Sequence, residues 1–210
     1  MVKVWDGGNG IDTFEDIFGN AAGAARVINL ALGRILFNGA DRDIVTGIEN
    51  VTVNNGSGVV GDDNANVITG VGVFSNTFAG GGGDDTVYGG GGNDALNGDA
   101  GSDWLYGGDG DDVLSVSGAE GWDSIYGGAG TDTAQFTSVL NLNIDLALGV
   151  YTAGKSKITH VIEEVEVVFA SAKNDTVIGT AGDETIYGGD GRDRIYSEGG
   201  ADLLMGDAGA

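Results

Sequence analysis

The sequence has no proline, no cysteine and a single histidine, His160. The lack of cysteine excludes disulfides and thiolate metal sites, and one histidine is too few for a histidine-rich metal site or a catalytic histidine pair. Basic residues are scarce as well: nine Lys and Arg stand against 32 Asp and Glu, which gives a net charge of −23. So acidic a chain disfavours nucleic acid as a partner and favours bound cations. No apolar run approaches the roughly 20 residues of a membrane-spanning helix, so we expect no membrane insertion.

Glycine is the residue in excess, with 42 of 210 positions, whereas its ordinary share is about 7%. Together with the absent proline and a hydrophobic content of 41%, this composition excludes collagen and disordered Pro/Gly linkers. We therefore expect the glycines to serve a compact structure that needs unusual backbone geometry at many points.

The glycines recur with a period of nine residues. Four nonapeptides follow one another from Gly80 as GGGGDDTVY, GGGGNDALN, GDAGSDWLY and GGDGDDVLS, and the register resumes at Gly118 with GAEGWDSIY and GGAGTDTAQ. A second array begins at Ala170 with the glycine-free copy ASAKNDTVI and continues with GTAGDETIY, GGDGRDRIY and SEGGADLLM. An isolated copy, GGNGIDTFE, starts at Gly7. A short fixed period of this kind indicates a solenoid.

Within each copy an acidic sixth residue and an apolar eighth residue lie two positions apart, as Asp103 and Leu105 do. This alternation predicts a short strand whose eighth residue points inward, preceded by a glycine-rich turn. Two copies then form one coil with a strand on each side, and successive coils stack at about 4.8 Å. The predicted fold is all-β, a parallel β-roll, and the absence of proline fits its uninterrupted ladders.

Stacking places the sixth-place acids of alternate copies above one another, where carboxylates about 5 Å apart repel unless a cation lies between them. Carboxylates and turn carbonyls make an all-oxygen ligand set, which favours Ca²⁺ over Mg²⁺, and we expect about six to eight ions. The predicted pairs are Asp85–Asp103, Asp103–Asp123, Asp94–Asp112, Asp112–Asp132, Asp175–Asp193 and Glu184–Asp202.

At these residues the sequence closely resembles the RTX (repeats-in-toxin, haemolysin-type) calcium-binding family, whose consensus is GGxGxDxUx with U a large apolar residue. The resemblance implies that turn carbonyls join the carboxylates in binding calcium. The side-chain ligands would be Asp85, Asp94, Asp103, Asp112, Asp123, Asp132, Asp175, Glu184, Asp193 and Asp202. The glycines whose carbonyls would bind are Gly81, Gly83, Gly90, Gly92, Gly101, Gly108, Gly110, Gly121, Gly128, Gly130, Gly189 and Gly191.

Some copies depart from the consensus, and each departure weakens one site. Asn66 and Asn76 stand in the acidic place of GDDNANVIT and VGVFSNTFA, so these two coils are expected to stack with weak calcium binding or none. Glu184 is one methylene longer than aspartate. Ala134 underfills the predicted core and marks the end of the first array.

The stretches between the arrays resemble each other: INLALG at 28–33 matches IDLALG at 144–149, and TGIENVTV at 46–53 matches HVIEEVEV at 160–167. Alternation in Val161–Val167 predicts a half-exposed strand. We expect the end of a preceding repeat block at 1–16, a connector at 17–60, a first repeat block at 61–135, a second connector at 136–169 and a second, truncated block at 170–210. Connectors are natural covers for the ends of a solenoid, because an end coil exposes apolar core.

Tyr88, Tyr106 and Tyr126 occupy the ninth place of alternate copies, so we expect a ladder of rings on one outer face with Trp104 beside it. Two interpretations stay open. The rings either stack along the sheet and stabilise it, or form a surface that binds a polysaccharide or a neighbouring domain.

The acidic connector residues Glu163, Glu164 and Glu166 are interpreted as a solvated strand face, and His160 has no nucleophile beside it, so we expect no enzymatic activity. The predicted function is calcium-dependent folding and structural support within a larger secreted or cell-surface RTX protein, such as a toxin or adhesin. Family resemblance connects this behaviour with type I secretion. The expected partners are calcium and the rest of the parent protein, and the alternative is a carbohydrate-binding or adhesive module that uses the tyrosine face.

Overall fold

The structure is a computed structural model, and it describes residues 4–16, 26–37, 40–54, 56–117, 121, 123–138 and 140–209. Residues 17–25, 38–39 and 55, which belong to the first predicted connector, lie outside the described residues. The described residues form strands and turns without a helix, so this part of the chain contains no helical segment able to cross a membrane.

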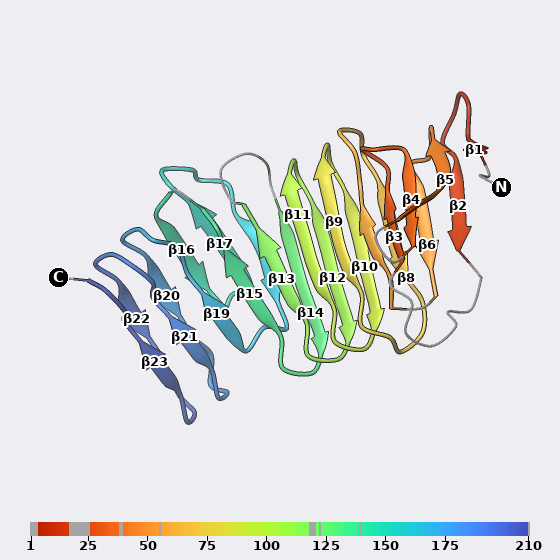
Figure 1. The fold of residues 1–210 in the computed structure, drawn as a ribbon. Coiled ribbons are helices and arrows are strands. Elements are labelled where there is room, and N and C mark those ends of the chain that lie inside the picture. The colour runs from red at the N-terminus through yellow and green to blue at the C-terminus, as the bar shows by residue number, and fades with distance from the viewer. Residues whose placement is uncertain are drawn as a thin grey trace.

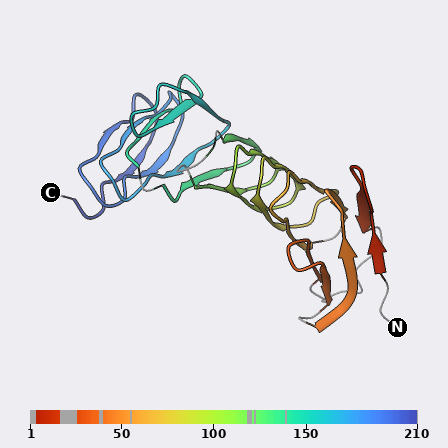
Figure 2. The same cartoon turned by 90° about the horizontal axis from the view of Figure 1, so that it is seen from above.

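The strands form two long sheets, and the coils stack along one axis with the two ends of the chain at opposite ends of the stack (Figure 1). Figure 2 shows from above that the molecule is elongated and bends along its length. In spatial order the first sheet contains β1 (Val4–Asp6), β5 (Ala40–Thr46), β4 (Arg34–Phe37), β3 (Arg26–Asn29), β7 (Gly58–Val60), β9 (Thr77–Gly82), β11 (Ala95–Ala100), β13 (Val113–Val116), β15 (Thr133–Phe136), β19 (Val167–Phe169), β21 (Thr185–Tyr187) and β23 (Leu203–Met205). The second contains β2 (Thr13–Asp16), β6 (Asn50–Val53), β8 (Val67–Gly70), β10 (Thr86–Gly91), β12 (Trp104–Asp109), β14 (Ser124–Ala129), β18 (His160–Glu163), β17 (Val150–Ala153), β16 (Leu142–Asp145), β20 (Thr176–Ile178) and β22 (Arg194–Tyr196).

The repeats pair in parallel with the register that the nine-residue period predicts. Val87 pairs with Leu105, and Leu105 pairs with Ile125, so each eighth-place residue lies beside its equivalent two copies away. Strands β11, β13 and β15 repeat this arrangement in the first sheet. The predicted all-β parallel β-roll is therefore confirmed.

The core is a thin layer of eighth-place side chains contributed by the two sheets. In the repeats from Val87 to Ile186 these residues are buried, as Leu105 and Leu114 are with 0% exposure. The Ala134 position is also buried, and the rings of Phe136 and Tyr151 pack edge to face next to it, with their centroids 4.9 Å apart. In the last coil Leu204 is 43% exposed. Burial of apolar area is the main stabilising contribution of each coil, so a coil whose eighth-place residue is exposed gains less from its core than one whose residue is buried.

The glycine turns allow the coils to approach closely. Gly108 has a φ of 110°, a backbone conformation that side-chain-bearing residues rarely adopt. A Cβ atom at this position would also collide with the carbonyl oxygen of Gly90, one coil away. Positive φ is shared by all the glycines whose carbonyls are predicted to bind calcium.

Each connector inserts three antiparallel strands into one sheet and leaves the other sheet continuous. In the first connector, β5, β4 and β3 separate β1 from β7, whereas β2, β6 and β8 stay parallel neighbours. In the second, β18, β17 and β16 separate β14 from β20, whereas β15, β19 and β21 stay parallel neighbours. The two repeat blocks therefore share both sheets, and the predicted domain boundaries stay a prediction.

The prediction of one half-exposed strand over Val161–Val167 is wrong. Glu164 has a φ of 57°, which no strand can accommodate, so β18 ends at Glu163 in the second sheet and β19 begins at Val167 in the first. Apolar and acidic residues alternate here because Ile162 and Val165 are buried on the two sides of this corner.

The corner also corrects the match between the two connectors. Gly47, with a φ of 61°, lies at the corner of the first connector as Glu164 does at that of the second. The N–H of Glu49 donates to the carbonyl of Asp12, and the N–H of Glu166 donates in the same way to that of Asp132. Glu49 is therefore equivalent to Glu166, so the match of TGIENVTV with HVIEEVEV is displaced by three residues.

Candidate metal centre

The sixth-place side chains form two columns, one along each sheet. The backbone N–H of Asp85 donates to Oδ1 of Asp103 at 2.9 Å, and that of Asp103 donates to Oδ1 of Asp123 at 3.1 Å. The same bond joins Asp94 to Asp112 at 2.7 Å, Asp112 to Asp132 at 2.9 Å, Asp175 to Asp193 at 2.9 Å and Glu184 to Asp202 at 3.0 Å. The six pairs expected from the sequence are thus neighbours, and their binding of metal stays a prediction.

Most of these carboxylates use only one of their two oxygens. Oδ1 accepts the N–H from the neighbouring coil, whereas Oδ2 is buried without a hydrogen-bond partner in Asp85, Asp94, Asp103, Asp112, Asp132 and Asp193. A buried carboxylate oxygen without a donor or a cation is energetically costly. Its repetition along both columns indicates that a ligand with positive charge belongs there.

The unpartnered oxygens face the first glycine of their own turn. A Cβ atom at Gly80 would collide with Oδ2 of Asp85 and would lie 2.8 Å from the carbonyl oxygen of Gly98. At Gly107 it would collide with Oδ2 of Asp112 and lie 2.5 Å from the carbonyl oxygen of Gly127. Carboxylate and carbonyl oxygens thus share a space that only glycine leaves open. Because both oxygens are hydrogen-bond acceptors, they cannot bond to each other. This donor set fits Ca²⁺, a hard cation that takes oxygen ligands.

The cation would need main-chain ligands. Among the described residues, no three Asp, Glu or His side chains gather closely enough to hold a metal ion by themselves. The turn glycines stack closely on one another, which brings turn carbonyls of one coil next to the turn of the next. For example, a Cβ at Gly110 would collide with the carbonyl of Gly92, and a Cβ at Gly128 with that of Gly108. The binding of calcium by these carbonyls stays a prediction.

Burial makes the charged form of these acids unfavourable when no cation is present. Desolvation, with a smaller contribution from neighbouring carboxylates, raises the pKa of Asp85 and of Asp103 from 3.8 to about 7, against the lowering effect of the N–H bonds. Desolvation likewise raises the pKa values of Asp94, Asp123 and Asp132 to about 6. The buried carboxylates of the columns therefore bind a proton or a cation more readily than an exposed carboxylate does.

The copy with Asn76 satisfies the same position without a cation. The N–H of Asn76 donates to Oδ1 of Asp94 at 2.6 Å, so the coil stacks normally. Its Nδ2 donates to the carbonyl of Gly89 at 3.1 Å, and both atoms crowd the ideal Cβ position of Gly70. An amide donor thus replaces the carboxylate acceptor beside a glycine carbonyl, which supports the expected weak or absent calcium binding in this coil.

In the second array, two of the predicted ligands have protein partners. The N–H and the hydroxyl of Ser171 donate to Oδ2 of Asp175 at 2.7 and 2.8 Å. Thr180 donates its N–H to Oε2 of Glu184 at 3.2 Å and its hydroxyl to Oε1. These carboxylates are therefore less available to a cation than that of Asp193, whose Oδ2 has no partner.

Sequence reasoning missed acids in the connectors that extend the columns. The N–H of Asp132 donates to Oε2 of Glu166 at 2.8 Å, and the N–H of Asp12 donates to Oε2 of Glu49 at 2.8 Å. The interpretation of Glu166 as a solvated strand residue is therefore wrong. A usable signal was present, because both glutamates lie two positions before a buried valine, the spacing that Asp103 and Leu105 have.

The aromatic ladder is present on the outer face of the second sheet. The rings of Tyr88 and Tyr106 lie 4.9 Å apart and those of Tyr106 and Tyr126 lie 4.8 Å apart, nearly parallel, with Trp104 stacked beside Tyr126 at 6.2 Å. Both faces of the Tyr106 ring are thus covered by neighbouring rings. This geometry favours the stabilising interpretation, because a sugar would need free ring faces for stacking.

Glycine turns, two parallel sheets and buried carboxylate columns define a β-roll of the calcium-binding type. A family model for the RTX calcium-binding nonapeptide repeat matches residues 71–105, 93–117, 100–134, 164–193 and 178–210. These matches cover more than half of the chain, and the chain belongs to this family. Repeats of the family bind calcium, are typical of secreted proteins and are generally structural rather than catalytic. A search of curated proteins found no match.

Proposed function

We propose that this chain is the calcium-binding region of a larger secreted protein, which folds when it binds Ca²⁺ outside the cell and then serves as a structural, secretion-supporting module. The observation that carries this proposal is the repeated buried Oδ2 atom without a partner, which shares a glycine-lined space with a carbonyl oxygen. The proposed role is structural, without catalysis.

The ligands would come from both columns and from the turns between them. We propose Oδ2 of Asp85, Asp94, Asp103, Asp112, Asp132 and Asp193 as the strongest side-chain ligands, because each is unpartnered. Asp123 and Asp202 would join them through their places in the columns. Asp175 and Glu184 would contribute less, since Ser171 and Thr180 already bond to them.

When bound, calcium supplies the positive charge that lets the columns stay ionised in a buried position. The chain itself contributes the stacked Oδ1 bonds that orient each carboxylate and the glycine turns that leave room for the ion. Because the site exists only in the folded coil, the free energy of calcium binding is free energy of folding. The thin core has little apolar area to offset carboxylate repulsion without it.

The proposal of an extracellular location rests on the affinity for calcium that sites of this kind have. Extracellular calcium modules bind with dissociation constants of about 10⁻⁴–10⁻³ M, which fits extracellular calcium and leaves the chain unfolded where calcium is scarce. An unfolded chain is the form that an export channel accepts. We do not extend the proposal to polysaccharide binding, because the ring faces of the tyrosine ladder cover one another.

Circular dichroism with and without a chelator tests the proposal. At neutral pH the chain is expected to show a β spectrum in millimolar Ca²⁺, to lose it on addition of EGTA and to regain it when calcium is restored. Magnesium at the same concentration is the matched control and is expected to restore less structure. A β spectrum that EGTA leaves unchanged would contradict calcium-dependent folding.

A further inference from the structure

The connectors, which lack the nonapeptide consensus, contain one acid each at the position that continues a carboxylate column. Val167 pairs with Thr133 on one side and with Thr185 on the other, so Glu166 lies between Asp132 and Glu184 in the column of the first sheet. Glu49 has the equivalent place after Asp12 in the second sheet. In each connector the column continues in the sheet that the hairpin strands leave uninterrupted.

The aspartate before each glutamate has the same unpartnered oxygen as the repeats. Oδ2 of Asp132 is buried without a hydrogen-bond partner in a residue that is 0% exposed, and Oδ2 of Asp12 is likewise buried without a partner. A Cβ at Gly127 would lie 2.8 Å from Oδ2 of Asp132 and would collide with the carbonyl oxygen of Glu164. In a repeat coil, the aspartate Oδ2 and a glycine carbonyl oxygen lie together beside the first glycine of the turn. Here Oδ2 of Asp132 and the carbonyl oxygen of Glu164, at the connector corner, lie together in the same way.

The first connector repeats this arrangement with different residues. A Cβ at Gly7 would lie 2.9 Å from Cγ of Asp12 and would collide with the carbonyl oxygen of Gly47, the residue at the corner. Gly47 and Glu164 both have a left-handed backbone, which fixes the direction of their carbonyls. The same cradle is therefore built twice, each time by a repeat copy that supplies the glycine and the aspartate and by a connector that supplies the glutamate and the corner carbonyl without the glycine turn of the consensus.

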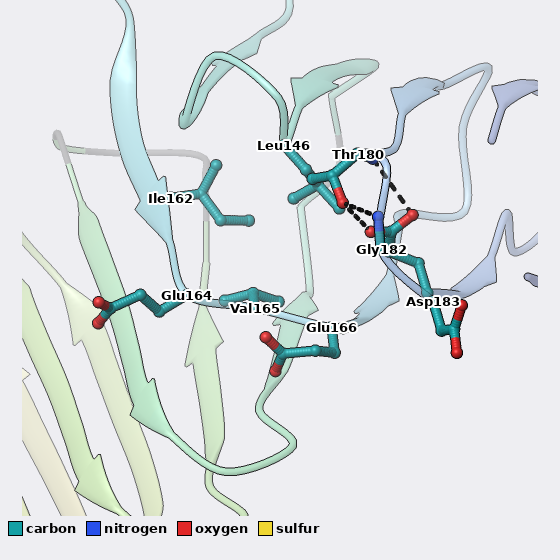
Figure 3. A pocket seen from close by; sticks show the side chains of 9 residues that line it. Leu146, Ile162, Glu164, Val165, Glu166, Thr180, Gly182 and Asp183 are labelled. Carbon is teal, nitrogen blue, oxygen red and sulfur yellow. Dashed lines mark hydrogen bonds between the residues drawn. The ribbon is translucent and has the colours of Figure 1, made fainter. Parts of the chain in front are cut away.

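The pocket beyond Glu166 is not part of the site. It has a volume of about 190 Å³, and its lining includes Glu166 and Glu184; Figure 3 shows the pocket from close by. Figure 3 shows that the carboxylates of Glu164, Glu166 and Asp183 do not converge there, and the carboxylate of Glu184 bonds to Thr180. The unpartnered oxygen lies on the opposite side of Glu166, towards the last coil of the first block.

We propose that each connector completes a calcium site that joins it to the preceding repeat coil. In the second connector the ligands are Oδ2 of Asp132, the carboxylate of Glu166 and the carbonyl of Glu164. In the first they are Asp12, Glu49 and the carbonyl of Gly47. This inference rests on the proposed function, since it extends calcium binding by the columns to residues outside the nonapeptides. Calcium there would fasten repeat block and connector together where the other sheet is interrupted.

Native mass spectrometry of the calcium-loaded chain tests the inference. Glu166→Gln keeps an oxygen for the N–H of Asp132 but removes the charge, and Glu163→Gln removes the same charge from an exposed residue of the same connector. At a fixed calcium concentration Glu166→Gln is expected to hold one ion fewer than the unmodified chain, and Glu163→Gln the same number. Glu49→Gln is expected to lose one ion as well.

The outcomes separate this inference from the proposed function. An unmodified chain that holds no calcium overturns both. An unmodified chain that holds calcium while Glu166→Gln retains every ion with unchanged affinity overturns the connector sites alone. If circular dichroism shows that Glu166→Gln does not fold in saturating calcium, the count for Glu49→Gln decides, and an unchanged count there overturns the inference.

Discussion

Without calcium, acidification from about pH 7.5 to about pH 5 is expected to stabilise the β-roll. The pKa of Asp103 is about 7 in the folded chain and 3.8 in its ordinary state, and desolvation is the main cause. Between these two values the folded chain binds more protons than the unfolded chain. Stability is therefore fully present below the lower value and is lost as the pH rises through the higher one.

The structure gives the size of this effect. One pKa unit corresponds to about 1.4 kcal/mol, so the Asp103 shift is worth about 4 kcal/mol over its whole interval and about 3 kcal/mol between about pH 5 and about pH 7.5, which solvent screening reduces to about 2 kcal/mol. Asp85 shifts as far, and Asp94, Asp123 and Asp132 shift less. Because neighbouring carboxylates are coupled, we expect a combined loss of roughly 5 kcal/mol, comparable with the whole stability of a small domain.

Circular dichroism measures this loss: the calcium-free chain is expected to lack the β spectrum at about pH 7.5 and to gain it, with measurable resistance to urea, as the pH falls to about 5. The buffers should be freed of calcium by a chelating resin, because protonation weakens EGTA at the acidic end. In saturating calcium the trend is expected to reverse, since calcium binds the ionised carboxylates. A calcium-free chain that is equally stable at both pH values, or more stable at the higher one, would refute the reasoning from buried carboxylates.

Two substitutions, one of them with a matched control, test the turns and the asparagine coil. Gly108→Ala is expected to cost about 3 kcal/mol or more in calcium-bound stability, because it combines positive φ with a collision against the carbonyl of Gly90. Gly8→Ala, where φ is also positive but the space is open, should cost about 1 kcal/mol; equal melting temperatures would contradict the stacking argument. Asn76→Asp is expected to add one calcium ion by native mass spectrometry, because it places an acceptor beside the carbonyl of Gly89; an unchanged count would contradict the assigned role of the amide.

The repeats could be predicted from the sequence because each position there has one physical task. Acid at the sixth place, apolar residue at the eighth and glycine in the turn determine the register, so Leu105 lies between Val87 and Ile125 as the period requires. The neighbouring pairs of acids follow directly from that register.

The connectors could not be predicted in the same way. The corner at Glu164 depends on a single left-handed residue that is not glycine. Because no glycine marks the corner, the alternation of apolar and acidic residues around it suggests a continuous strand. The partners of Asp175 and Glu184 were also hidden, because Ser171 and Thr180 are ordinary turn residues until the fold brings their hydroxyls to the carboxylates. The carboxylate columns can therefore be predicted from the sequence only where glycine turns accompany the acidic residues.

The most direct test of the central claim is the position of calcium in crystals of the loaded chain, located by anomalous scattering at a long X-ray wavelength. The account predicts peaks beside Oδ2 of Asp85, Asp94, Asp103 and Asp112, within the glycine-lined spaces between coils. Peaks confined to exposed acids such as Asp84, with none beside the buried oxygens, would contradict it.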